Sequence, residues 1–203
     1  MRSKTTIGLV LTAILLFVSA NAVQAQNVTK EIKVDNFNRM DLTTVGVVYF
    51  TQGAKHSVKI EGKKAQVDKN LVSVKGGTLY IEPKEETLNA QKDGVNIYIT
   101  APSVEQIVFC GVGMFQCNEQ LKADDLECTL EGVGKMEIKN LICHSLDVEI
   151  EGVGKGEIHV QCDELKAEVA GIGSLTLSGK AKRADISRDG IGSVNTSDLE
   201  IID

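Results

Sequence analysis

The chain has 203 residues, of which 42% are apolar, and this balance is typical of a single globular domain. Its 28 acidic and 22 basic residues give a net charge of −6, which argues against nucleic acid or an anionic membrane as a partner. The 19 glycines and the absence of tryptophan favour a thin, regularly stacked aliphatic core over a bulky aromatic one.

Residues 1–25 are predicted to be an export signal. Arg2 and Lys4 precede an apolar run at residues 7–18, and small residues lead to a cleavage site after Ala25. The run is shorter than the roughly 20 residues that a transmembrane helix needs, so we expect no membrane-spanning segment after cleavage. The mature chain would carry a net charge of −8 and would be exported to the periplasm, the outer surface or the medium.

Short alternating segments in residues 26–103 predict an irregular series of strands. Residues 63–70 are polar and predict a turn or a single helical turn. Gly76-Gly77 predicts either a hairpin turn or a coil corner between two strands. The expected strands cover residues 28–34, 37–53 with a break around Val45-Gly46, 56–62, 71–74, 78–82 and 95–100.

Residues 104–203 repeat the phrase Gly-Val-Gly or Gly-Ile-Gly five times, at intervals of 21, 20, 19 and 19 residues. A fixed period near twenty, with alternating apolar residues on both sides, is typical of stacked β units that share one core. We expect the paired glycines at corners, where φ is positive or a neighbouring backbone stacks closely. These corner glycines are Gly111, Gly113, Gly132, Gly134, Gly152, Gly154, Gly171, Gly173, Gly190 and Gly192.

Aligning the repeats on their glycines predicts three inward-facing columns per period, with the residues between them facing water. The column before the glycines holds Leu126, Cys128, Leu130, Leu146, Val148, Ile150, Leu165, Ala167 and Val169. The column after them holds Phe115, Cys117, Met136, Ile138, Gly156, Ile158, Leu175, Leu177, Val194 and Thr196. The third column holds Leu121, Ala123, Leu141, Cys143, Val160, Cys162, Gly179 and Ala181.

Three inward faces per period predict an all-β fold, a right-handed single-stranded parallel β-helix with coils of about twenty residues and an irregular N-terminal half. Each coil would rise by one strand spacing, roughly 4.8 Å. An up-and-down barrel ranks second because it would need turns at every strand end. A phosphate-binding loop is not expected, since no helix follows the glycines and no lysine and serine complete the motif.

Several blocks resemble the head GIN domain family, the putative auto-transporter adhesins of exported bacterial proteins. They are residues 37–42, 46–53, 57–62 and 77–81 together with the five glycine phrases, and the match spans about residues 33–196. The resemblance implies a β-helical surface or periplasmic protein of a Gram-negative lineage of the gut-bacteroides type, forming one domain over residues 26–203. It carries over no catalytic residues, and from the sequence we expect no membrane β-barrel of the kind that a true auto-transporter carries.

All five cysteines belong to the predicted mature chain, so at least one of them has no partner within it. Cys143 and Cys162 fall in one column of adjacent coils, where the Cα spacing would permit a disulfide. The alternative is a buried stack of free thiols. Cys117 and Cys128 are expected in the core, and Cys110 is the best candidate for an exposed thiol.

No metal or cofactor site is expected. Glutamates and lysines should form ladders on the outside of two coils, and interleaved lysines argue against calcium there. His144 and His159 have acidic or thiol neighbours in sequence, but adjacent strand residues face opposite sides. The ladder residues are Glu131, Glu151, Lys135, Lys155, Glu137 and Glu157, with Asp147 and Glu149 nearby.

The sequence favours a non-enzymatic binding module whose partner is an unknown macromolecule or a surface glycan. Asp185, Arg188 and Asp189 come nearest to the carboxylate cluster of a glycan-active enzyme, which is the alternative function. A passive envelope component is a third alternative. The last coil, residues 184–203, shows no capping helix and could associate with another copy. The three tyrosines are expected to be partly buried in the irregular half.

Overall fold

The computed structural model describes residues 27–84 and 93–202, and the predicted export signal lies outside them. Within these residues the protein is almost entirely β-structure, with one short helix, α1 (Lys64–Val67). The strands are β1 (Asn27–Ile32), β2 (Arg39–Leu42), β3 (Val45–Gln52), β4 (Ser57–Lys63), β5 (Asn70–Lys75), β6 (Thr78–Pro83), β7 (Val95–Ala101), β8 (Gln106–Phe109), β9 (Val112–Lys122), β10 (Asp125–Leu130), β11 (Val133–Ile142), β12 (Ser145–Ile150), β13 (Val153–Val169), β14 (Ile172–Arg188) and β15 (Ile191–Ile201).

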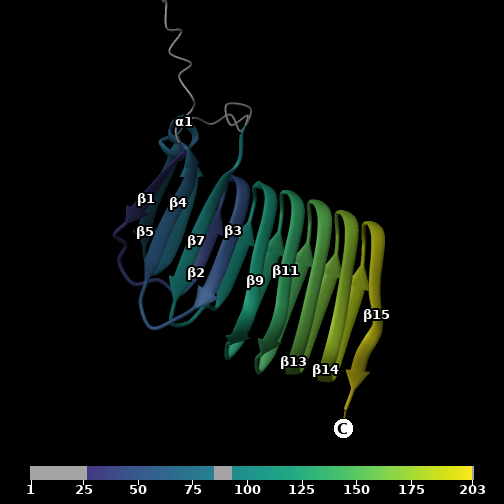
Figure 1. Ribbon diagram of the computed structural model, residues 1–203. Helices are drawn as coiled ribbons and strands as arrows, with labels where there is room; N and C mark the ends of the chain where they lie inside the picture. Colours follow the sequence, from purple (N-terminus) through teal and green to yellow (C-terminus); the bar gives the residue numbers. More distant parts are fainter. Residues whose placement is uncertain (1–26, 85–92, 203) are drawn as a thin grey trace, which may run out of the picture.

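The C-terminal half confirms the predicted β-helix. Strands β9, β11, β13, β14 and β15 lie side by side and parallel, in chain order (Figure 1). The residue pairs at the glycine phrases are in exact register, so that Val133 lies between Val112 and Val153. The segments before the glycines pair in the same way, through β8, β10, β12 and the second half of β13. One chain path therefore winds into about five stacked turns.

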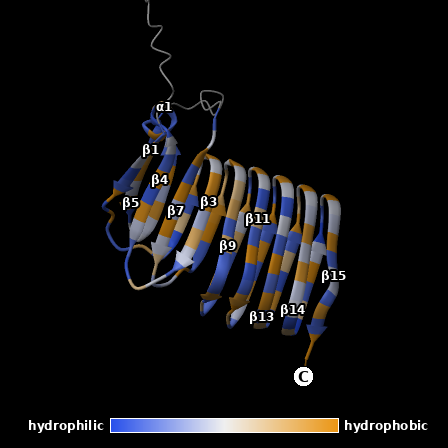
Figure 2. Cartoon of the chain, viewed as in Figure 1, coloured by the Kyte–Doolittle hydropathy of each residue, from blue (hydrophilic) through white to orange (hydrophobic). Residues whose placement is uncertain are grey.

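The predicted inward columns form the core of these turns. Every residue of the column before the glycines is at most 3% exposed, and Val148 is fully buried. Orange and blue bands alternate along the strands in Figure 2, as expected when one face is buried and the other is wet. In the last turn Val194 and Thr196 are only half-buried, because no further coil of the described chain covers them.

The paired glycines lie where neighbouring coils approach most closely. A Cβ atom on Gly152 would lie 2.0 Å from the carbonyl oxygen of Gly132, and one on Gly132 would lie 2.0 Å from that of Gly111. No side chain fits in that space. Close stacking of backbones, rather than a sharp turn with positive φ, thus explains most of these glycines, since only Gly113 and Gly134 among them have a positive φ.

The N-terminal edge departs from the parallel arrangement. Strand β4 pairs antiparallel with β7, β1 pairs antiparallel with β4, and β5 pairs antiparallel with β6. The cause of the last pairing is local: Gly76 and Gly77 have φ values of 56° and 79°, and two residues with positive φ form the tight turn of a hairpin. These strands and α1 close the N-terminal end of the coil.

The first coil of the chain is not the first coil in space. Strand β2 lies between β6 and β8, and β3 lies between β7 and β9, all in parallel (Figure 1). The unit β2–β3 is therefore inserted between a later unit, β6–β7, and the regular turns. Phe50 and Phe115 stack across this junction, with ring centroids 6.5 Å apart. In the described part of the chain no helix is long and apolar enough to cross a membrane.

Candidate functional site

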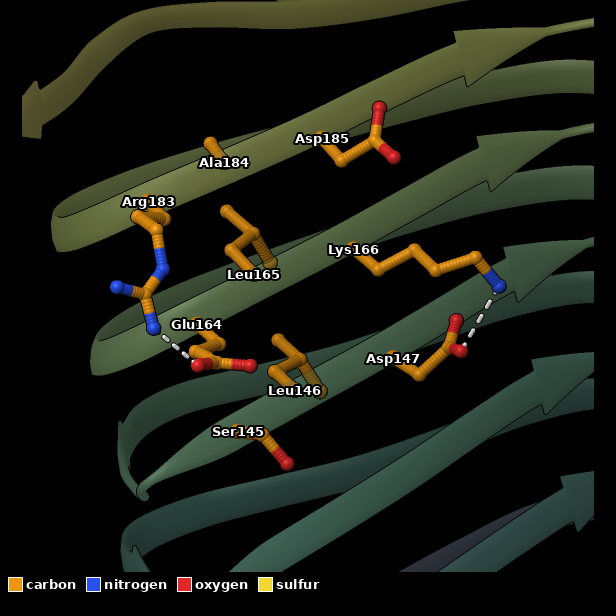
Figure 3. Close-up of a pocket in the computed structure, with 9 residues that line it drawn as sticks. All are labelled: Ser145, Leu146, Asp147, Glu164, Leu165, Lys166, Arg183, Ala184 and Asp185. Carbon is orange, nitrogen blue, oxygen red and sulfur yellow. Dashed lines mark hydrogen bonds and ion pairs between the residues drawn. The ribbon is translucent and has the colours of Figure 1, made fainter.

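A groove crosses β12, β13 and β14 on the outside of the regular turns (Figure 3). Its volume of about 730 Å³ lies within the roughly 300–1,000 Å³ typical of ligand sites. Backbone stacking places its polar side chains in two columns that run from coil to coil. One column holds Ser145, Glu164 and Arg183, the other holds Asp147, Lys166 and Asp185, and Leu146, Leu165 and Ala184 lie between them.

Ion pairs join neighbouring coils along both columns. Lys166 Nζ lies 2.9 Å from Asp147 Oδ2, and the Arg183 guanidinium contacts the Glu164 carboxylate. The hydrogen bond to Asp147 raises the pKa of Lys166. All four side chains are at least 40% exposed, so these pairs contribute little to stability and their remaining donors and acceptors face solvent. The groove can therefore form hydrogen bonds with a polar ligand.

The three residues predicted for a glycan-active enzyme do not all line the groove. Asp185 lines the groove, whereas Arg188 ends β14 and donates through Nη1 to the carbonyl oxygen of Gly192, 3.1 Å away. Asp189 follows at the corner. Four residues of extended chain place the Cα atoms of the two aspartates about 13 Å apart.

The predicted charge ladder forms on the face that follows the glycines. Lys135 Nζ lies 2.5 Å from Glu157 and 3.3 Å from Glu137, and Lys155 Nζ lies 2.5 Å from Glu157. Hydrogen bonds to the two lysines lower the pKa of Glu157, and the same contacts raise the pKa of Lys135. The carboxylates are thus already paired with ammonium groups. Residues 27–84 and 93–202 contain no group of three metal-ligating side chains.

Two tyrosines lie on the same outer face, over β3 and β7. The Tyr49 and Tyr98 rings stack on one another, with centroids 5.1 Å apart and planes 14° apart. Lys59 Nζ lies 4.3 Å from the centroid of Tyr98. Since these contacts already cover ring faces, the pair is a packed ladder and not an open platform for a sugar.

All five cysteines are free thiols in the structure. Cys143 and Cys162 lie in adjacent coils, as predicted, and share a hydrogen bond that raises the pKa of Cys143 and lowers that of Cys162. Cys117 and Cys128 are buried, and burial raises the pKa of Cys117 to about 11. Cys110 is half-buried and donates to Glu131, and desolvation together with this hydrogen bond raises its pKa to about 12.

His144 and His159 make separate contacts on the outer surface. His144 Nδ1 lies 3.3 Å from Asp163, and His159 Nδ1 lies 2.9 Å from the hydroxyl of Ser178. Each contact joins one coil to the next. Neither histidine shares its site with a cysteine.

The exposed aliphatic side chains were not anticipated from the sequence. The middle residue of every glycine phrase points into solvent, with exposed fractions from 41% to 76%. We call this line the aliphatic ridge. It consists of Val112, Val133, Val153, Ile172 and Ile191. The alternation of inward and outward positions around each glycine pair is the signal that could have revealed it.

Comparison with known proteins identifies a family and several solved structures that are similar to this chain. The family model described as "Putative auto-transporter adhesin, head GIN domain" matches residues 36–203. No curated protein matches the sequence. Among solved structures, a putative adhesin from Bacteroides fragilis is 26% identical, with a TM-score of 0.66 over 84% of this chain and 97% of its own.

Two structures from Parabacteroides distasonis share the fold at lower identity. One is a putative lipid binding protein, 20% identical, with a TM-score of 0.77 over 87% of this chain and 76% of its own. The other is a putative adhesin, 17% identical, with a TM-score of 0.71 over 87% of this chain and 75% of its own.

Proposed function

Because the chain belongs to the head GIN domain family, we propose that it is an exported binding module without catalysis, which holds a surface glycan or another macromolecule against the outside of its coils. The family description and the B. fragilis relative support adhesion over an enzymatic role. The predicted export signal and the family description support a location in the periplasm or on the outer surface.

The groove of Figure 3 is the observation on which this proposal rests. Its two basic and three acidic side chains offer donors and acceptors in nearly equal number and leave one excess negative charge. Such a surface suits the hydroxyl groups of an uncharged glycan better than a polyanion. The hydrogen bond of Arg188 to Gly192, outside the groove lining, supports binding over hydrolysis.

Glycan-array binding by the mature protein, followed by titration of any glycan retained, tests the proposal. We expect Lys166→Ala combined with Arg183→Ala to weaken binding at least about tenfold, the equivalent of 1.4 kcal/mol. Lys155→Ala is the matched control, because Lys155 is a similarly exposed, ion-paired lysine on another face. Equal losses in both variants, or turnover of a glycan that stops with Asp185→Ala, would contradict the proposal.

A further inference from the structure

The aliphatic ridge is not explained by the requirements of the coil. Val and Ile favour strands because they are β-branched, but Thr is β-branched too and would be better solvated. The five ridge residues are nevertheless all aliphatic, although they are 41–76% exposed. They account for most of the large exposed hydrophobic side chains in the described residues; the others, Leu71, Ile186 and Ile201, lie off the ridge.

The ridge stands clear of neighbouring side chains. A glycine flanks each ridge residue on both sides, and stacking leaves no room for a Cβ atom at either glycine column. The ridge residues are aligned in direct register from β9 to β15, so their spacing is one strand separation, about 4.8 Å. The result is a straight apolar line with a column of glycines, which lack side chains, along each side.

Opposite charges lie beyond the two glycine columns. Glu131 and Glu151 lie two residues before the ridge, and Lys135 and Lys155 lie two residues after it. Glu131, Glu151 and Lys155 are exposed, and Lys135 is partly exposed. A partner that covers the ridge must therefore present an apolar line with basic groups on one side and acidic groups on the other.

A second copy of this chain meets that requirement in one orientation. If the two-fold axis runs along the ridge, the two coils lie side by side and parallel. Each Glu131 then faces the partner's Lys135, and each Glu151 faces the partner's Lys155. A two-fold axis across the ridge would instead place glutamate against glutamate and lysine against lysine.

We propose that the aliphatic ridge is a self-association surface, on which two copies pack side by side and parallel, ridge against ridge. Apolar contact supplies the affinity, and the flanking charges set the orientation. The ridge is one side chain wide, so the interface belongs to the weak class below about 1,200 Å². A two-fold axis parallel to the coils reverses every direction perpendicular to them, so the two grooves would open on opposite sides of the dimer.

Sedimentation equilibrium of the mature protein over a concentration series tests this proposal without any ligand, so its outcome is independent of glycan binding. We expect a reversible monomer–dimer equilibrium. The variant Val133→Thr, Val153→Thr, Ile172→Thr keeps β-branched shapes and should weaken the dimer at least about tenfold. A thermal melt close to that of the parent protein checks that the variant is folded.

The matched control is Ile186→Thr with Ile201→Thr, two exposed isoleucines off the ridge, which should leave the dimer unchanged. Loss of association in this control alone would overturn the proposal in favour of contact through the last coil. A monomer at all concentrations would overturn it as well.

Charge reversal tests the orientation. Glu131→Lys with Glu151→Lys, and separately Lys135→Glu with Lys155→Glu, should each dimerise less than the parent. Mixing the two variants should restore association, because lysine columns then face glutamate columns. Undiminished dimerisation of either variant alone, while both melt cooperatively, would overturn the parallel arrangement.

Discussion

The regular turns of residues 104–202 stack in chain order, whereas the coils of residues 27–103 stack out of order. In the regular turns, each strand pairs with the corresponding segment about twenty residues away. In the N-terminal region, β2 pairs with β6 on one side and with β8 on the other, and both strands lie far from β2 in sequence. The inner faces are nevertheless continuous. One stacked core can therefore be assembled either from a short repeat or from separate segments whose inward residues match.

The two regions also close differently. The N-terminal end is covered by antiparallel strands β1, β4 and β5. At the other end β14 is the only described strand that pairs with β15, and Ile191 is 76% exposed. Contact of the last coil with another copy remains a prediction that the control variant above addresses.

The largest expected effect comes from filling the space between stacked backbones. Gly152→Val should destabilise the fold by on the order of 3 kcal/mol or more, because its Cβ would overlap the carbonyl oxygen of Gly132. Gly76→Ala is the control from the other region: no atom lies within 4 Å of its Cβ, and only its φ of 56° opposes the change, at about 1–2 kcal/mol. Urea denaturation measures both. Equal costs would mean that the coils are not stacked as closely as described.

The junction between the regions gives the next largest effect. Phe115→Ala should cost about 3–5 kcal/mol, because it removes a fully buried ring that stacks on Phe50. Met114→Ala, on the same strand but half-exposed, should cost less than about 1 kcal/mol. If Phe115→Ala gives two separate unfolding transitions, the two regions are joined mainly through this contact. An unchanged midpoint would contradict the assigned junction.

Alkaline pH should destabilise the regular turns, which contain all the cysteines. Burial raises the pKa of Cys117 to about 11, so the folded state keeps this thiol protonated where the unfolded chain ionises it. The stabilisation is complete below the unfolded pKa and is lost as the pH rises from about 8.5 toward 11, by at most about 1.4 kcal/mol per pH unit for one thiol. Cys117→Ala should flatten this slope of unfolding free energy against pH. An unchanged slope would show that Cys117 is not buried.

The smallest effect is expected at the charge ladder. Lys135→Ala should cost less than about 1 kcal/mol at neutral pH, because these partly exposed ion pairs lie at the surface, where water screens them. Because the lysines lower the pKa of Glu157, this contribution is present above the usual pKa of 4.5 and is lost as the pH falls through the folded value. Thermal melts of parent and variant at pH 7 and pH 3 should therefore converge at the lower pH. A difference that persists at pH 3 would point to packing of the lysine stem instead.

The regular turns were predictable because local sequence determines their register. The glycine spacing and the alternation around Val148 identify inward and outward positions without knowledge of any distant segment. The coil order of the N-terminal region was not predictable, since nothing local to β2 specifies pairing with β6 on one side and β8 on the other. At Gly76-Gly77 the sequence predicts either a hairpin turn or a coil corner. The positive φ values of the two glycines show that the chain forms the hairpin.

The binding surfaces were predictable only in part. Alternation places Asp147 and Lys166 outside, but the groove depends on how three coils align, which the outward positions alone do not specify. The enzyme alternative grouped Asp185 with Asp189 by closeness in sequence, and extended chain separates them. The ridge was not predicted, although the alternation of inward and outward positions around each glycine pair places the middle residue outside.

Cross-linking between coils tests the stacked register most directly. In a cysteine-free background, the ridge pair Val133→Cys and Val153→Cys lies in adjacent coils, about 4.8 Å apart at Cα. The pair Val133→Cys and Ile172→Cys lies two coils apart, about 10 Å. We predict that mild oxidation forms an intramolecular disulfide in the first variant and not in the second, as measured by mass spectrometry of the monomer. Efficient cross-linking of the second pair, or none of the first, would contradict the stacked coil.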